Sequence, residues 1–225
     1  MAFQLPNDVL ESFTRSDLYH NSFLIREDAG LESALKNSKE KGLRDIAVSP
    51  AQGKLLKLLA QSIGAKRILE VGTLGGCSTI WLAQALQPDG EIVTLEISED
   101  NAKIARENLA TAGLRNAQVV VGNAVETMAT LNPEIPFDFV FIDADKPSNL
   151  TYFREAKRLV RKRGVIIVDN VVRKGDVACP SWSDASAEGV RTLLAALKDD
   201  KEVDATTIAT VGEKGYDGFL YAIKL

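Results

Sequence analysis

Cysteine and histidine are scarce in this chain of 225 residues, which contains only Cys77, Cys179 and His20 of these two types. Two cysteines cannot build a disulfide framework or a zinc knuckle. A reducing, intracellular environment is therefore expected, and we predict a cytoplasmic protein.

Long hydrophobic runs and an excess of positive charge are missing as well. The longest apolar runs, such as Phe139–Ile142 and Val165–Val168, are too short to cross a bilayer, and the first residues lack the pattern of a secretory signal. The formal net charge is −4, with both signs mixed along the chain. The basic stretch Lys157–Arg163 is interpreted as the solvated end of a helix. We expect a soluble protein that binds neither membranes nor nucleic acids.

The hydrophobic pattern predicts a single α/β domain over residues 1–225. Residues 1–65 show helical spacing of the leucine and phenylalanine side chains Leu10, Phe13, Leu18, Leu55, Leu58 and Leu59. From residue 66 onward, short apolar runs alternate with helical stretches. The expected strands are Arg67–Val71, Glu91–Ile97, Gln118–Gly122, Phe137–Ala144 and Gly164–Asn170. The expected helices are Ser78–Ala85, Glu99–Ala112, Ala124–Leu131, Leu150–Val160 and Ala185–Leu197.

Strands that are apolar on both faces and separated by helices predict a mostly parallel sheet covered on two sides. The last two predicted strands, Asp204–Val211 and Gly218–Leu225, are joined by a turn that contains glycine. Such a hairpin would bring one antiparallel strand to a Rossmann-like sheet of seven strands.

A glycine-rich turn follows the first predicted strand. Gly72 begins a G-x-x-G-G pattern, which is followed by Ser78. This glycine spacing differs from the G-x-G-x-x-G of dinucleotide-binding turns. Glu70 precedes the turn and would repel a pyrophosphate, whereas it suits a cationic ligand such as S-adenosylmethionine (SAM). Glu96 ends the second strand, where an acid is placed to accept hydrogen bonds from ribose hydroxyls. A helix-capping role for Glu96 is the alternative.

Polar residues gather where the fourth and fifth predicted strands end. Asp143 and Lys146 follow the fourth strand, and Asp169 and Asn170 end the fifth. Because parallel strands end at one edge of the sheet, these side chains are expected to meet. Two carboxylates and an amide oxygen form a hard, all-oxygen donor set suited to Mg²⁺. The alternative, in which both aspartates only cap helices, leaves Lys146 and Asn170 unexplained.

These motifs together resemble the cation-dependent O-methyltransferases, the group that contains the catechol and caffeoyl-coenzyme A enzymes. The resemblance covers about residues 20–225 and includes the stretch Val48–Gly53. It implies that the metal, Mg²⁺ or another divalent cation such as Mn²⁺ or Ca²⁺, is bound by Asp143, Asp169 and Asn170, and that Lys146 is the general base. It implies SAM contacts from Val48, Glu70, Gly72, Ser78, Glu96, Ala124, Asp143 and Asp145. It also implies a small phenolic substrate and a homodimer formed through the N-terminal helices, where Leu10, Phe13, Leu24 and Ile25 are the expected contact residues.

Three other functions compete with this interpretation. A nicotinamide-dependent reductase is disfavoured because the G-x-G-x-x-G pattern and a Tyr-x-x-x-Lys pair beside the fifth strand are both missing. A SAM-binding regulator without activity is disfavoured by the complete set of Asp143, Lys146, Asp169 and Asn170. A metal-independent methyltransferase is the nearest competitor. The identity of the phenol stays open, because the loop Arg173–Asp184 matches no known pattern.

Overall fold

Three helices occupy the first part of the chain in the computed structural model, which describes residues 6–225. They are α1 (Asn7–Leu24), α2 (Ala29–Glu40) and α3 (Pro50–Ser62). The Ser49 hydroxyl caps α3 by accepting a hydrogen bond from the Gln52 amide at 3.2 Å, and Pro50 occupies the first helical turn, where its missing N–H costs nothing. Residues 1–5 of the predicted helical segment lie outside the described residues.

The helical spacing in this segment identified the helices, but it did not identify their buried faces. Leu18 and Leu58 are exposed, whereas the buried residues of α3 are Gly53, Leu56 and Ala60. In α1 no described side chain is buried. Leu10, Phe13 and Leu59 are partly buried, so the spacing includes both exposed and packed positions.

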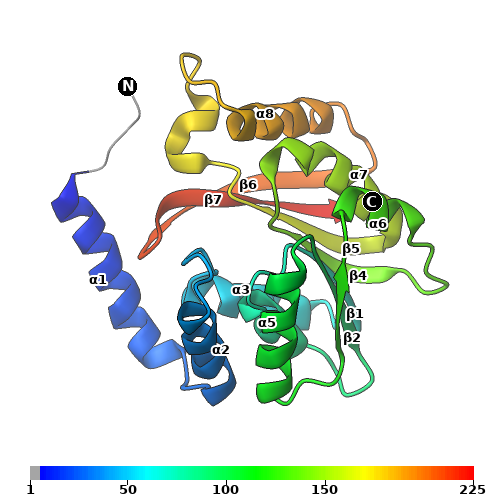
Figure 1. Ribbon diagram of the computed structural model, residues 1–225. Helices are drawn as coiled ribbons and strands as arrows, with labels where there is room; N and C mark the ends of the chain where they lie inside the picture. Colours follow the sequence, from blue (N-terminus) through cyan, green and yellow to red (C-terminus); the bar gives the residue numbers. More distant parts are fainter. Residues whose placement is uncertain (1–5) are drawn as a thin grey trace.

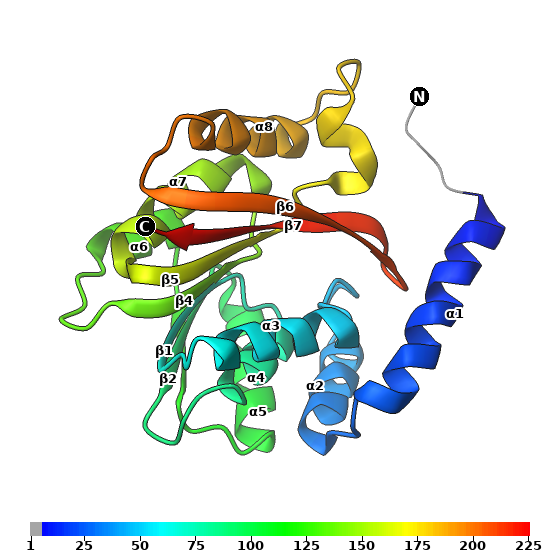
Figure 2. The same cartoon turned by 180° about the vertical axis from the view of Figure 1, so that it is seen from behind.

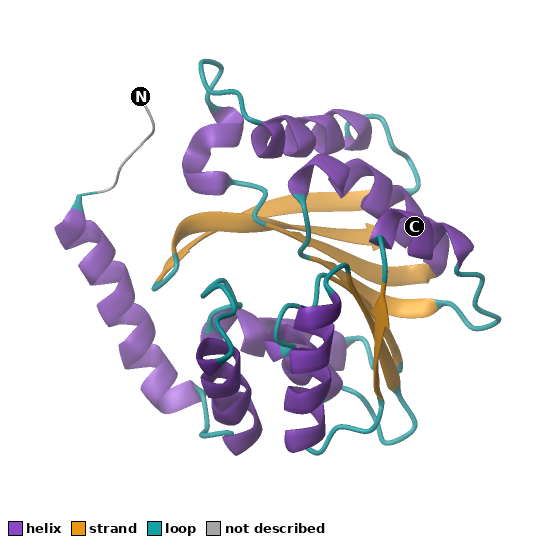
Figure 3. Cartoon of the chain, viewed as in Figure 1, coloured by secondary structure: helices purple, strands orange, loops and turns teal. Residues whose placement is uncertain are grey.

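The sheet has seven strands in the order β3-β2-β1-β4-β5-β7-β6 (Figures 1 and 3). β7 pairs antiparallel with both of its neighbours, and the pairings among β1 to β5 are parallel. The predicted mostly parallel sheet with one antiparallel strand is thereby confirmed. The strands are β1 (Arg67–Val71), β2 (Glu91–Glu96), β3 (Ala117–Val121), β4 (Phe137–Ile142), β5 (Val160–Asp169), β6 (Val203–Gly212) and β7 (Gly215–Lys224).

Helices cover both faces of this sheet, as Figures 1 and 2 show from opposite sides. Phe139 and Phe141 of β4 pack on one face, and Val140 and Ile142 pack on the other, because side chains alternate along a strand. The first face is covered mainly by α2, α3, α4 (Cys77–Ala83) and α5 (Glu99–Thr111), and the second by α6 (Ala124–Thr130), α7 (Asn149–Leu159) and α8 (Ala185–Leu197). Within the described residues, no helix is both long and apolar enough to span a bilayer.

The basic stretch Lys157–Arg163 is the main correction to the predicted elements. β5 begins at Val160, four residues before the predicted start, so the second half of this stretch is strand rather than helix end. Three of its cations, Lys157, Arg158 and Arg161, also form ion pairs with carboxylates. Lys157 contacts Asp200 at 2.7 Å, and Arg161 contacts Asp138 at 2.5 Å.

Candidate active site

A cavity of about 1230 Å³ opens at the carboxyl ends of the parallel strands. Ten of the eleven residues predicted for the site line it together, and Glu70 is the exception. The ten are Val48, Gly72, Ser78, Glu96, Ala124, Asp143, Asp145, Lys146, Asp169 and Asn170. The expected meeting of the strand ends at one edge of the sheet is therefore seen in the structure.

Gly72 allows the ends of β1 and β4 to touch. Its φ of +98° lies in the left-handed region, and a Cβ at this position would lie 2.1 Å from the carbonyl oxygen of Asp143. The Asp143 amide in turn donates to the Val71 carbonyl at 2.8 Å. Any side chain at Gly72 would push Asp143 out of place, so this glycine positions two parts of the cavity at once.

Glu70 lies beneath the glycine turn instead of in the cavity. It is fully buried, and the Thr79 hydroxyl donates a hydrogen bond to its Oε2. Burial raises the pKa of Glu70 to about 7, although nearby hydroxyl groups oppose this shift. Its Oε1 has no hydrogen-bond partner among the described residues. Glu70 is therefore absent from the cavity lining in this structure, whereas Ser78 lines the cavity, and the contact of Glu70 with a ligand stays a prediction.

Glu96 fixes the shape of the turn as well as lining the cavity. Its Oε2 accepts the amides of Thr73 at 3.3 Å and Leu74 at 2.8 Å, and its Oε1 accepts the Ser98 amide at 2.9 Å. Leu74 has a positive φ of +51°, which a non-glycine residue adopts only when its surroundings hold it. The carboxylate of Glu96 supplies part of that restraint.

Asp145 is held by a local set of hydrogen bonds. Its carboxylate accepts from the Ser148 hydroxyl at 2.6 Å and from the Tyr152 hydroxyl at 2.5 Å. These bonds outweigh the effect of partial burial and lower the pKa of Asp145. Asp145 therefore stays ionised and oriented in the cavity.

Two carboxylates and a lysine form the polar end of the cavity. The Lys146 ammonium lies 2.8 Å from Oδ1 of Asp143, and its side chain is only 8% exposed. Asp169 accepts a hydrogen bond from the Gln52 side-chain amide at 2.7 Å and another from the backbone N–H of Asn170 at 2.8 Å. Burial, and then the charge of Asp143, raise the pKa of Asp169 to about 7. Within the described residues, no group of three or more His, Cys, Asp or Glu side chains is placed to hold a metal ion. The predicted ligand set has only two such residues, Asp143 and Asp169, together with the amide side chain of Asn170.

The sequence analysis missed two neighbours of this cluster. Gln52 was noted only as part of the Val48–Gly53 stretch, and Arg173 only as the start of an unassigned loop; both line the cavity. The signal for Gln52 was its place in the first turn of α3, after a serine cap and a proline. Trp182 lies in the same loop but does not line the cavity, and its indole N–H donates to Asp184 at 3.0 Å.

The fold and the cavity define an α/β protein that binds its ligands at the carboxyl ends of parallel strands. A family model described as O-methyltransferase matches residues 22–223. The chain therefore belongs to the O-methyltransferase family and is a methyl-transferring enzyme, as predicted.

Close relatives agree with this assignment. A catechol O-methyltransferase of Mycobacterium tuberculosis is 48% identical over 92% of this chain and 94% of its own length. One of Niastella koreensis is 43% identical over 97% of this chain and 99% of its own. The crystal structure of an O-methyltransferase from Bacillus cereus in complex with SAH is 44% identical, covers 96% of this chain and 100% of its own, and superposes with a TM-score of 0.93.

Proposed function

We propose that this enzyme transfers a methyl group from SAM to one of two vicinal hydroxyls of a catechol-like acceptor, with the help of a divalent cation. The observation that carries the proposal is the shared cavity. It joins the glycine turn and Glu96 to the polar cluster of Asp143, Lys146, Asp169 and Asn170. The names of the two catechol relatives and the SAH bound in the Bacillus cereus enzyme support the same reaction.

The glycine-turn side of the cavity fits SAM. Glu96 would accept the ribose hydroxyls, Ala124 would contact the adenine, and Val48, Gly72 and Ser78 would surround the methionine part. SAM supplies the methyl group on a sulfonium, a leaving group that needs no proton from the protein. The chain's own task is to hold the acceptor oxygen in line behind that methyl group.

The donor set at the opposite end of the cavity fits a hard cation. Burial raises the pKa of Asp169 to about 7, and its hydrogen-bond donors, the Gln52 side chain and the Asn170 backbone, are both neutral, so a cation at this place would stabilise the charged carboxylate. Asp143, Asp169 and Asn170 would hold the metal. A divalent cation such as Mg²⁺ there would supply Lewis acidity, which lowers the pKa of a phenol from its usual value of about 10.

Lys146 is the group placed to receive the proton of the acceptor hydroxyl. Its Nζ lies in the cavity wall, bonded to Asp143, which keeps the long side chain in one orientation. The Gln52 side chain donates to Asp169 at 2.7 Å, so both acids are held by hydrogen bonds before the acceptor arrives. Such prior positioning reduces the entropy that must be lost when the acceptor binds.

The test uses purified enzyme, SAM and a panel of catechol, caffeoyl and flavonoid acceptors. Activity should disappear after chelation and return with Mg²⁺, Mn²⁺ or Ca²⁺. Asp169→Ala should abolish turnover while SAM affinity, measured by calorimetry, stays within about threefold. Full activity in chelator would establish a metal-independent methyltransferase instead, and an equal loss of SAM affinity would show that Asp169 belongs to the SAM side.

A further inference from the structure

The charges that line the cavity are divided into two zones. At the strand ends, Asp143 pairs with the Lys146 ammonium, and Asp169 accepts hydrogen bonds from the neutral groups of Gln52 and Asn170. Besides Lys146, the cations that line the cavity are Lys39, Arg44, Arg173 and Lys214. Lys39 and Arg44 are exposed, and Lys214 pairs with Asp45 at 3.2 Å.

Arg173 is half-buried, whereas the other three cations are exposed. Unlike Lys214, it also forms no ion pair with a described residue. No carboxylate of the described residues lies within 4.0 Å of its guanidinium nitrogens. Asp184 is near enough to feel its charge, but that carboxylate is already used by the Ala187 amide at 2.7 Å and the Trp182 indole at 3.0 Å. A partly desolvated cation that faces a cavity is best compensated by an anion that enters the cavity.

The turn that carries Arg173 is held in an unusual backbone conformation. Asn170, Arg173 and Lys174 have φ values of +57°, +51° and +58°. Left-handed conformations cost energy in non-glycine residues and persist only where the surroundings impose them. Oδ1 of Asp217 provides such a restraint, because it accepts the amides of Val172 at 3.2 Å and Arg173 at 2.7 Å.

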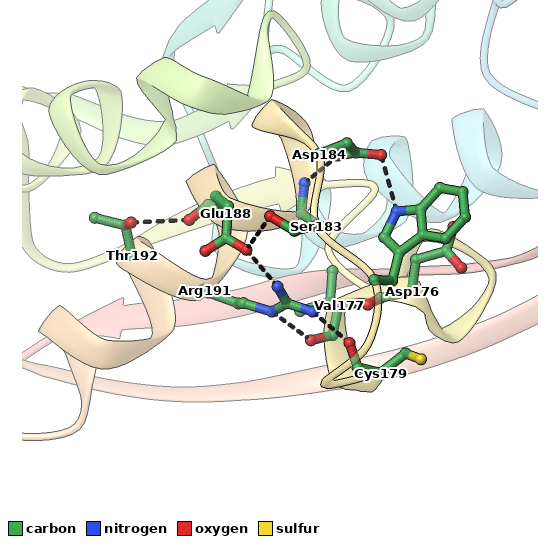
Figure 4. Close-up of polar contacts among 10 residues, drawn as sticks. Asp176, Val177, Cys179, Ser183, Asp184, Glu188, Arg191 and Thr192 are labelled. Carbon is green, nitrogen blue, oxygen red and sulfur yellow. Dashed lines mark hydrogen bonds and ion pairs between the residues drawn. The ribbon is translucent and has the colours of Figure 1, made fainter. Parts of the chain in front are cut away.

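The far end of the same loop is fixed from α8, as Figure 4 shows. The Arg191 guanidinium donates to the carbonyls of Val177 at 2.9 Å, Asp176 at 3.1 Å and Cys179 at 2.7 Å. Glu188 in turn forms an ion pair with Arg191. The segment from Asn170 to Cys179 is therefore fixed at both ends, and Arg173 is placed before any ligand binds.

We propose that Arg173 binds a carboxylate of the acceptor, so the preferred acceptors are catechols that carry an acidic group away from the reacting hydroxyls. This inference rests on the proposed function. A guanidinium matches a carboxylate with two parallel hydrogen bonds, and a pre-positioned one loses little entropy on binding. Arg173 lies three residues after Asn170 and lines the same cavity, so one rigid acceptor can reach both ends.

The test compares 3,4-dihydroxybenzoate with its methyl ester, which has the same two hydroxyls but no negative charge. In the wild type, kcat/KM should favour the acid. Arg173→Gln should lower the acid-to-ester ratio of kcat/KM by about 10- to 100-fold, the range for a lost hydrogen bond to a charged group. Lys174→Gln is the matched control, because it removes the same charge from the next residue, which is exposed and outside the cavity lining; the ratio should change less than about threefold.

Calorimetry adds a readout that does not depend on turnover. With SAH and Mg²⁺ present, the Kd ratio of the two compounds should shift by the same factor, and Arg173→Lys, which keeps the charge, should shift it less. Equal losses for acid and ester in Arg173→Gln, or a wild type that prefers the ester, would overturn the inference. Failure of the proposed function looks different: neither compound is methylated, while acid binding still depends on Arg173.

Discussion

The ion pair between Lys146 and Asp143 has to change during the proposed reaction, because the Lys146 ammonium must give up a proton. At 2.8 Å, the Lys146 Nζ donates to Asp143, and an ammonium cannot accept a proton from a phenol. The lysine must therefore lose a proton before it acts as the base. The acceptor phenol must ionise in the same proposed step, so the dependence of activity on pH would reflect the whole site rather than one residue.

Replacement of this lysine tests the mechanism at its central residue. Lys146→Ala should lower kcat by roughly 10²- to 10⁴-fold, the range for a lost general base, with the fold and SAM affinity retained. The residual activity should keep rising with pH, since hydroxide or a more ionised phenol must replace the lysine. Nitrocatechols, whose phenols are more acidic, should lose least. An equal loss on acidic and ordinary catechols, with an unchanged pH profile, would assign Lys146 to substrate positioning only.

Glu70 gives a prediction about stability and pH in the protein without ligands. Its pKa is raised from 4.5 to about 7 by burial, so between these values the unfolded chain releases a proton that the folded chain keeps. Stability should fall as pH rises through this window and then level off. The full effect is on the order of 3 kcal/mol, because one pKa unit corresponds to about 1.4 kcal/mol. Denaturant titrations from pH 4 to 8 should show this slope in the wild type and a flatter curve in Glu70→Gln; identical slopes would contradict it.

At the scale of elements, the regular strands and helices follow from local patterns, and the loop between β5 and α8 does not. Short apolar runs that alternate with helical stretches predicted β1 to β5 and the helices between them to within a few residues, apart from the start of β5. The loop Arg173–Asp184 has no periodicity, because its shape comes from Asp217 and Arg191, which lie far along the chain. Long-range polar contacts of this kind leave no pattern in the loop itself.

Asp217 should therefore control the order of that loop. Asp217→Ala leaves the amides of Val172, Arg173 and Gly218 without their shared acceptor and should cost about 1–3 kcal/mol of stability. Hydrogen exchange at these amides should become faster, whereas exchange in the core of β1 should follow the global stability. Asp217→Asn keeps an acceptor oxygen and is the control. Unchanged exchange in Asp217→Ala would show that the loop holds its own shape.

At the scale of the whole molecule, α1 lies at one side of the protein, near the turn between β6 and β7 (Figures 1 and 2). None of its residues is buried, and Leu18, Tyr19, Phe23 and Leu24 are each more than half exposed. A polar link to the body is the bond from the Glu213 amide to Asp17 at 2.9 Å. Of the residues expected at a dimer contact, Leu24 is exposed, and Leu10, Phe13 and Ile25 are half-buried. An apolar helix surface of this kind fits the predicted pairing of two copies.

The dimer is tested by making this surface polar. The wild type should have twice the chain mass by light scattering at micromolar concentration, and Phe23→Ser with Leu24→Ser should shift it toward the monomer. Ile135→Ser is the control, because Ile135 is 66% exposed in the loop before β4. A wild type that is monomeric under these conditions, or a double variant with unchanged mass, would show that α1 does not mediate pairing.

The sequence by itself determined the layered α/β fold and the edge of the sheet at which the site lies. Alternating apolar strands and helices have few ways to pack. Parallel strands all end at one edge of the sheet, so the sequence places Asp143 and Asp169 at the same edge. Only the tertiary structure decided which neighbours complete the site. It placed Glu70 beneath the turn, brought Gln52 to Asp169 and aimed Arg173 into the cavity. Such contacts join residues that are distant in the chain, and their geometry depends on how whole helices and loops pack against the sheet.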